Sequence, residues 1–294
     1  MKLTKDFRLK VREAILADRE NYGGSDAAYA KTLGINASAF SVIKKGETER
    51  VVSDDKWLNW GRRLNVTLHA NTWKIARTVV YVNIENNLQY CKNFSKSMIL
   101  VDNNGIGKTE CAKHVIQGIK NAFYFDCSQA KTKQQFIRKL ALTIGIDDKG
   151  KYTEVKDNLK YYLNIIERPL IVLDEAGDLE YMAFLEIKEL WNGTEGNCGW
   201  YMMGAAGLAE KVEAGIKRKK VGFAEIFDRF ADEFVNLVPK GDPRLKTDFY
   251  QQLIGDVALV NAPKGQIPKL VRKCVTKDKT KSLRHLKDLI TANN

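Results

Sequence analysis

A short apolar run that leads directly into a glycine-containing loop and then a helix constrains this chain most. Residues 98–101 read Met-Ile-Leu-Val, a continuous apolar segment typical of a strand covered on both faces. The loop of residues 102–107 contains two glycines, and residues 110–120 form the expected helix. Because strands covered on both faces belong mostly to parallel sheets with helices on either side, this order predicts an α/β fold.

The loop carries the residue types that a chain of phosphates requires. Gly105 and Gly107 let backbone N–H groups wrap around phosphate oxygens, and the helix that follows adds a field that favours anions. Lys108 would neutralise the β- and γ-phosphates, and the Thr109 hydroxyl would bind Mg²⁺. The segment therefore predicts a P-loop with ATP and Mg²⁺ as cofactors. Its predicted nucleotide-binding residues are Asn104, Gly105, Ile106, Gly107, Lys108, Thr109 and Glu110.

The loop departs from the usual P-loop pattern at its first position, where Asp102 replaces glycine. Asp and Asn tolerate left-handed backbone better than other non-glycine residues, so Asp102, Asn103 and Asn104 can still build the turn. A carboxylate beside phosphates is unfavourable unless it points away from them.

A second motif agrees with the first. Residues 169–173 form an apolar run that ends in Asp174 and Glu175, the pattern of a Walker B strand. Asp174 would help to hold Mg²⁺ together with Thr109, and Glu175 would orient or deprotonate the attacking water. The pair of motifs predicts an ATPase.

Further apolar runs between helical segments complete the predicted sheet. Because strands that alternate with helices form parallel sheets with right-handed crossovers, we expect a parallel sheet flanked by helices. The additional strands are expected at residues 123–127, 200–204 and 233–237. The C-terminal segment, residues 244–294, is expected to form helices broken around Pro263 and Pro268.

The N-terminal segment has the pattern of short helices separated by turns. Ser25 and Asp26 are candidate N-caps for a helix over residues 27–33, Gly34 ends it, and Asn36 caps a helix over residues 37–45. A further helix is expected over residues 52–68. Its apolar face would close a small core with Trp57, Trp60 and Leu64.

Residues 26–47 resemble the helix-turn-helix of lambda-repressor-like DNA-binding proteins, through small Ala30, the turn Gly34-Ile35 and a buried-type Val42. The resemblance implies that the second helix enters the major groove. It places Ser38, Ser41, Lys44 and Lys45 among the DNA-binding candidates. A small helical bundle used for protein contacts is the alternative interpretation.

The net charge of +12 is concentrated at the two ends of the chain. Residues 1–75 hold 14 Lys and Arg against 9 Asp and Glu, residues 76–238 hold 22 of each, and residues 239–294 hold 12 against 5. A neutral centre with basic ends favours contact with an anionic polymer, although solvated charged faces give the same count. The five scattered cysteines form no CxxC pair, which argues against a disulfide framework and a zinc site.

As a whole the chain resembles AAA+ ATPases, and among them the transposition regulators typified by the phage Mu transposition protein B. The resemblance implies a helix-turn-helix DNA-binding domain over residues 1–70, an ATPase core over 71–240 and a C-terminal helical lid over 241–294. It implies an arginine finger at Arg229, with Arg218 as a rival, and a sensor-2 residue at Arg284 that contacts the phosphates.

Each of these arginines has a plainer interpretation, since Arg229 can pair with Asp228 or Asp232 and Arg284 lies in a basic tail. At the sensor-1 loop the chain departs from the resemblance, because Ala205 and Ala206 stand where a polar residue is usual. That departure puts the rate of hydrolysis in doubt but not nucleotide binding.

The same resemblance implies the partners. They are duplex DNA bound largely without sequence preference, a transposase, and further copies of the chain in a helical filament or ring. Loop residues Lys131, Thr132, Lys133 and Lys151 would contact DNA phosphates. Two alternatives stay open: a loader or remodeller of a replicative helicase, and a nucleotide-liganded DNA-binding regulator without significant turnover.

The sequence predicts no association with a membrane. It has no apolar run of about 18 residues, and residues 1–18 lack the apolar region of a secretory signal. We therefore expect a cytoplasmic protein, in a bacterium or a phage-infected host cell.

Overall fold

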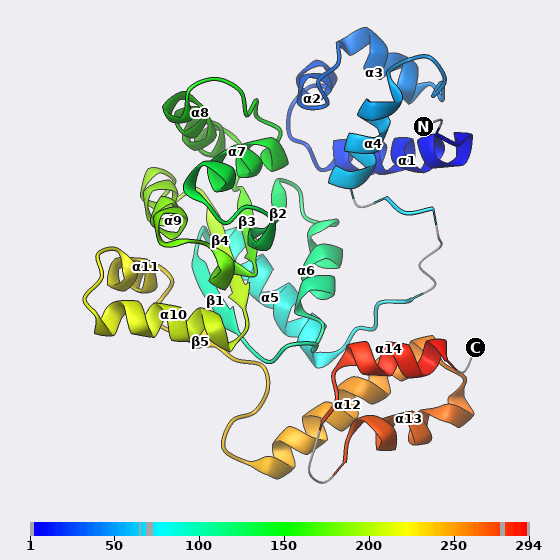
Figure 1. Cartoon of the computed structure of the whole chain (residues 1–294), viewed down its shortest axis with the longest axis vertical. Coiled ribbons are helices and arrows are strands. Elements are labelled where there is room, and N and C mark those ends of the chain that lie inside the picture. Colours follow the sequence, from blue (N-terminus) through cyan, green and yellow to red (C-terminus); the bar gives the residue numbers. More distant parts are fainter. Residues whose placement is uncertain (1–2, 65, 69–72, 277–279, 293–294) are drawn as a thin grey trace.

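The computed structural model describes residues 3–64, 66–68, 73–276 and 280–292 and consists of three groups of elements (Figure 1). Four helices precede a central parallel sheet that is flanked by helices, and three further helices follow it. In the view of Figure 1 the N-terminal helices lie at the top of the molecule and the C-terminal helices at the bottom. The sheet lies at a height between them.

The sheet has five strands, all parallel, in the order β2-β3-β4-β1-β5. This confirms the predicted parallel sheet, although β5 is shorter than the predicted 233–237. One consequence of the order is that β1 and β3 are not neighbours, because β4 lies between them. The strands are β1 Ser97–Val101, β2 Ala122–Asp126, β3 Leu170–Asp174, β4 Gly199–Gly204 and β5 Phe234–Val235.

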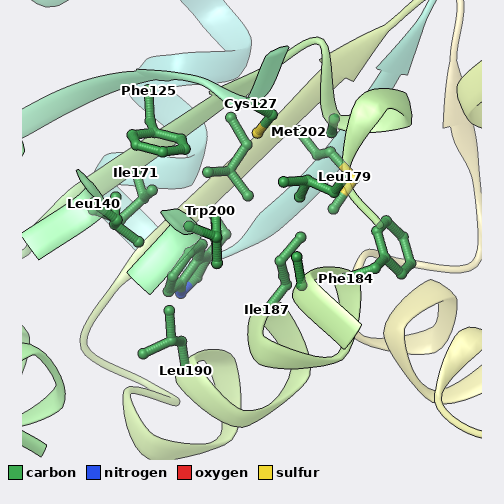
Figure 2. Close-up of a cluster of buried hydrophobic side chains, with 14 of the residues drawn as sticks. Phe125, Cys127, Leu140, Ile171, Leu179, Phe184, Ile187, Leu190, Trp200 and Met202 are labelled. Atoms are coloured by element: carbon green, nitrogen blue, oxygen red, sulfur yellow. The ribbon is translucent and has the colours of Figure 1, made fainter. Parts of the chain in front are cut away.

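Helices cover both faces of the sheet, and strand residues alternate between two hydrophobic clusters. Tyr201 and Val172 face α5 and α6, whereas Trp200 and Ile171 face α7 to α11. Figure 2 shows Trp200 surrounded by apolar side chains from neighbouring strands and from α7 and α9. The helices are α5 Val79–Phe94, α6 Lys108–Ile116, α7 Lys133–Ile144, α8 Tyr152–Ile165, α9 Tyr181–Gly193, α10 Ala206–Lys217 and α11 Phe223–Arg229.

The N-terminal helices enclose a hydrophobic cluster of their own, which contains Trp57 and Trp60 as predicted. Ser25 and Asn36 cap α2 and α3 by accepting backbone N–H groups, and Gly34 between them has a φ of 68°. The last helix is shorter than the predicted 52–68. The four helices are α1 Lys5–Glu20, α2 Asp26–Thr32, α3 Ala37–Lys44 and α4 Asp54–Arg63.

The expectation that Val42 is buried was wrong. Val42 is 38% exposed, whereas its neighbours along the core face of α3, Phe40 and Ile43, are buried. Phe40 and Ile43 are three residues apart and so share a face of the helix, which turns Val42 toward solvent.

A polar seam joins the N-terminal helices to the central part. The Asn121 N–H donates to the Asn21 carbonyl at 3.2 Å, and the Asn21 side-chain amide donates to the Gln117 carbonyl at 3.0 Å. Asn121 is 3% exposed and has a φ of 56°, a left-handed conformation that asparagine tolerates.

The C-terminal helices are α12 Pro243–Asn261, α13 Ile267–Cys274 and α14 Leu283–Thr291. They pack into the hydrophobic cluster that also contains α5 and α6, through residues such as Leu253 and Leu286. The predicted break around Pro263 and Pro268 is confirmed, because α12 ends at Asn261 before Pro263 and Pro268 lies in the first turn of α13. A proline is tolerated there, since its missing N–H has no partner within the helix.

All five cysteines are buried and unpaired, as expected of small apolar residues. Within the described ranges, no group of three or more His, Cys, Asp or Glu side chains is arranged to hold a metal ion. None of the helices among those residues has the length and apolar character needed to cross a membrane.

The contrast between the adjacent residues of α3 is testable. We expect Ile43→Ala to destabilise the N-terminal helices by about 2–5 kcal/mol, because it leaves a cavity in a closed core. Val42→Ala should change the free energy of unfolding by less than about 0.5 kcal/mol. Urea unfolding followed by tryptophan fluorescence measures both, and equal effects of the two substitutions would contradict the assignment of the faces.

Candidate functional site

The loop between β1 and α6 has the backbone that its glycines predicted. Gly105 and Gly107 have φ values of 75° and 98°, in the left-handed region that favours glycine. The loop ends at the first residue of α6, where unpaired N–H groups and the helix field favour an anion. The predicted residues 104–110 are therefore contiguous around one helix N-terminus.

Lys108 is held inside the loop rather than in solvent. Its side chain is buried, and Nζ donates to the carbonyl oxygens of Asp102 at 2.8 Å and Asn103 at 2.9 Å. Burial lowers the pKa of Lys108, and the nearby carboxylates of Asp102, Asp174 and Glu175 oppose that shift. Since the hydrogen-bond partners of Nζ among the described residues are carbonyl oxygens and not carboxylates, its charge is available to a phosphate.

The two predicted motifs meet in a single hydrogen bond. The Thr109 hydroxyl donates to Oδ2 of Asp174 at 2.6 Å. Asp174 ends β3, which is not the strand beside β1, because β4 separates the two. The contact forms nevertheless, since Thr109 lies in the first turn of α6 and Asp174 at the carboxyl end of β3.

Tyr124 on β2 is a site residue that the sequence analysis missed. Its hydroxyl donates to the same Oδ2 of Asp174, at 2.6 Å. Burial and the Asp174 charge raise the pKa of Tyr124, so the phenol keeps its proton and remains a donor. Tyr124 faces α6 because the alternation of β2 places it there, but only the strand order reveals that it reaches Asp174.

The donor set fits a magnesium ion bound to phosphates. The Thr109 hydroxyl and the Asp174 carboxylate are hard oxygen ligands, and Mg²⁺ in nucleotide sites is commonly held by one or two protein oxygens with phosphates and waters. Thr109 and Asp174 are therefore the two residues that would hold the ion.

Glu175 lies next to Asp174 in a strained conformation. Its φ is 50°, in the left-handed region, and the residue is only partly covered by its neighbours. Partial burial raises the pKa of Glu175, and the charge of Asp174 raises it further. A carboxylate whose pKa moves toward neutrality becomes a better proton acceptor, which suits a general base. Strained backbone of this kind is common at functional sites.

Asp102 points away from the interior of the loop, which is the condition for a carboxylate at this position. Its carboxylate is buried and accepts the N–H groups of Leu237 and Val238, which follow β5. The departure from glycine at this position therefore places no free carboxylate beside the phosphate site.

The start of α14 packs onto the same loop. The Leu283 N–H donates to the Gly105 carbonyl at 2.8 Å, and a Cβ on Gly105 would lie 2.4 Å from Cβ of Ser282. The next residue, Arg284, is exposed and close enough for its charge to lower the pKa of Lys108. The structure thus brings Arg284 to the loop, where its predicted role in contacting phosphates remains a prediction.

Arg229 lies at the opposite edge of the sheet. Its Nε donates to Asn192 at 2.6 Å, and its guanidinium lies 5.3 Å from the ring centre of Trp191. Trp191 in turn donates to Ser97, the first residue of β1, which identifies this edge as the amino edge. Arg229 is therefore outside the site of its own chain, and a role at the phosphates requires a neighbouring copy.

The plainer interpretation of Arg229 was an ion pair with Asp228 or Asp232. In the described part of the chain, Arg229 forms neither of these ion pairs. The rival Arg218 is exposed at the end of α10. Ala205 and Ala206, after β4, bring no polar side chain to the site, as their identities imply.

The residues predicted to contact DNA lie at separate places. Lys131 pairs with Asp178 at 2.8 Å and Lys133 with Glu186 at 3.0 Å, so part of their charge is offset within the chain. Thr132 caps α7 and Lys151 precedes α8.

The candidates on α3 differ from one another. Lys44 pairs with Asp26 at 2.6 Å, whereas Ser38, Ser41 and Lys45 are exposed. The part of α3 that is open to a ligand therefore carries two hydroxyls and one lysine without a carboxylate partner among the described residues.

Comparison with known families supports the nucleotide site. A family model described as an AAA domain matches residues 94–212, a range that contains the loop, Thr109 and Asp174. No curated protein sequence matches the chain. The match supports a nucleotide-dependent AAA+ ATPase, a class that generally binds ATP with Mg²⁺. The parallel five-stranded sheet flanked by helices fits an α/β P-loop NTPase.

The environment of Glu175 gives a prediction that does not depend on catalysis. A raised folded-state pKa favours the protonated acid, so the ionised form costs stability above that pKa and the cost vanishes below the pKa of the unfolded chain. Glu175→Gln, which mimics the protonated acid, should therefore raise Tm at pH 7–8. The gain should shrink as the pH falls through the raised pKa and be absent below about 4.5, the ordinary pKa of a glutamate. Thermal unfolding across this range checks the sign, and a lower Tm for the variant at neutral pH would contradict it.

Proposed function

We propose that the protein is an AAA+ ATPase that binds ATP with Mg²⁺ at the loop of residues 102–109 and hydrolyses it with Glu175 as the water-orienting residue or base. The observation that carries this proposal is the 2.6 Å hydrogen bond between Thr109 and Asp174. It brings the two oxygen ligands expected of a magnesium site together beside a buried lysine at a helix N-terminus.

The roles of the residues follow from their positions. Lys108 exchanges its two carbonyl partners for phosphate oxygens, which are charged and therefore stronger acceptors. Tyr124 keeps Asp174 oriented, and Glu175 stands beside Asp174 where an attacking water would be activated. The magnesium ion, when bound, neutralises charge on the phosphates.

Hydrolysis by a single copy should be slow. The segment after β4 has two alanines where a polar residue would help to place the water, and Arg229 lies at the far edge of the sheet. We propose that a neighbouring copy supplies an arginine, so that assembly completes the site. The same alanines favour the second candidate function, a nucleotide-liganded regulator with little turnover.

We further propose that the ATP-bound copies assemble on duplex DNA as a helical filament or ring and present it to a transposase. The support is the resemblance of the whole chain to transposition regulators, the excess of basic residues at both ends and the exposed surface of α3. A loader of a replicative helicase would share these features and is distinguished by its partner.

The site can be tested with two opposing substitutions. Lys108→Ala should abolish ATP binding and ATP-dependent assembly on DNA. Glu175→Gln should bind ATP without hydrolysing it and stay assembled on DNA. Filaments or rings on duplex DNA are counted by electron microscopy, with and without a slowly hydrolysed ATP analogue.

Lys120→Ala is the matched control for Lys108→Ala, because it removes an exposed lysine beyond the end of α6. Equal hydrolysis by the wild type and Glu175→Gln would remove Glu175 from its role. ATP binding that changes neither the oligomeric state nor the affinity for DNA would count against assembly.

The α3 surface gives an independent test of DNA binding. Lys45→Ala should weaken binding to duplexes of any sequence by a similar factor and reduce the slope of log K against log salt by about 1, as loss of one phosphate contact does. Fluorescence anisotropy over a salt series measures both quantities, with Lys120→Ala again as the control. An unchanged salt slope would place the DNA elsewhere.

A further inference from the structure

The loop of this chain begins with a buried carboxylate that is hydrogen-bonded on both oxygens. Oδ2 of Asp102 accepts the N–H of Leu237 at 2.5 Å and that of Val238 at 2.8 Å, and Oδ1 accepts the N–H of Asn103 at 2.7 Å. Asp102 is 9% exposed. Hydrogen bonds to an ionised acceptor are roughly twice as strong as neutral ones, so this cluster fixes the position of the residues it joins.

The segment that Asp102 holds is the connection to the C-terminal helices. Residues 236–242 lead from β5 to α12, and the two bound N–H groups lie near the start of this connection. The next loop residue reaches α12 itself, because the Asn103 amide donates to the Tyr250 hydroxyl at 2.8 Å. In the reverse direction, the Asn236 amide donates to the Val101 carbonyl.

The same two loop residues also hold the lysine. Asp102 and Asn103 offer their main-chain carbonyls to Lys108 and their side chains to the connection and to α12. When Lys108 turns to a phosphate, both peptide groups lose their charged partner. A movement of these two loop residues therefore also acts on the connection of residues 236–242 and on α12. These two elements lead along the chain to α14 and Arg284.

We infer that Asp102 is a positioning residue that couples the occupancy of the phosphate loop to the C-terminal helices. The inference rests on the proposed ATP site and adds a regulatory connection to it. The usual glycine at this position could not form that connection, because it has no side chain. Asp102 does not touch the reacting atoms, and it acts by fixing the loop against the connection of residues 236–242.

The test uses Asp102→Asn and Asp102→Gly in the full chain. Asn keeps the shape but loses the charge, and Gly restores the usual P-loop residue. We expect each to raise KM for ATP by about tenfold, the effect of losing one charge-assisted hydrogen-bond cluster. We expect kcat to stay within about threefold, because Asp174 and Glu175 lie on another strand. Hydrogen exchange at the Leu237 and Val238 amides, without nucleotide, should become faster.

Two further variants separate coupling from general loosening. Tyr250→Phe removes the other connection without altering the loop and should raise KM by a smaller factor. Asp242→Asn is the matched control, since Asp242 caps α12 by accepting the Arg244 N–H at 2.8 Å and asparagine caps helices equally well. It should change neither KM nor the exchange of Leu237 and Val238.

The outcomes are distinct. Wild-type KM in Asp102→Gly overturns the inference, as does unchanged exchange at Leu237 and Val238 in Asp102→Asn. A lower kcat with unchanged KM overturns it too, because that pattern reflects a smaller folded fraction. If the wild type binds no ATP, the proposed function fails and the coupling with it. In that case, hydrogen exchange at the Leu237 and Val238 amides still shows whether Asp102 holds the connection of residues 236–242.

Discussion

The hydrogen bond between Thr109 and Asp174 depends on almost every feature of the central fold. Thr109 lies in α6, which follows β1, and Asp174 is the last residue of β3, and β4 separates these two strands. The two side chains meet because all the strands are parallel and end at the same edge. Burial of β3 and β4 on both faces fixes that edge, since each strand is packed between two hydrophobic clusters. Tyr124 adds a second donor to the same oxygen, so the carboxylate is oriented from both sides.

The parts of this site that sequence could predict are the local ones. The positive φ values of Gly105 and Gly107 follow from the residue type, and the strand before the loop follows from a run of apolar residues. The order of the strands, and with it the contact of Tyr124, depends on pairings between distant segments, about which the sequence carries no direct signal. The sequence showed that a carboxylate at Asp102 has to turn away from phosphates, but not where it turns, because its partners after β5 lie far along the chain. The Val42 error had a simpler cause, because periodicity leaves the phase of a short helix uncertain by one residue.

The chemistry of the site is divided between the two edges of the sheet. The loop, Asp174, Glu175 and Arg284 gather at the carboxyl edge, whereas Arg229 is held against Asn192 and Trp191 at the amino edge. In the assembly proposed above, the candidate phosphate site of one copy would meet Arg229 of the next. Such a contact is heterologous, and copies that associate through unlike surfaces form closed rings or open helical arrays.

The N-terminal helices close their hydrophobic cluster without any residue from the central part, and a few polar contacts around Asn21 and Asn121 attach them to it. Substitutions inside this cluster therefore leave the cores of the central part unchanged, because the cluster contains no residue of that part. The outward surface of α3 can diversify under selection while the phosphate loop stays unchanged. Recombination that exchanged the N-terminal helices for another small domain would leave the cores of the central part intact, since only the contacts at their junction would have to be rebuilt.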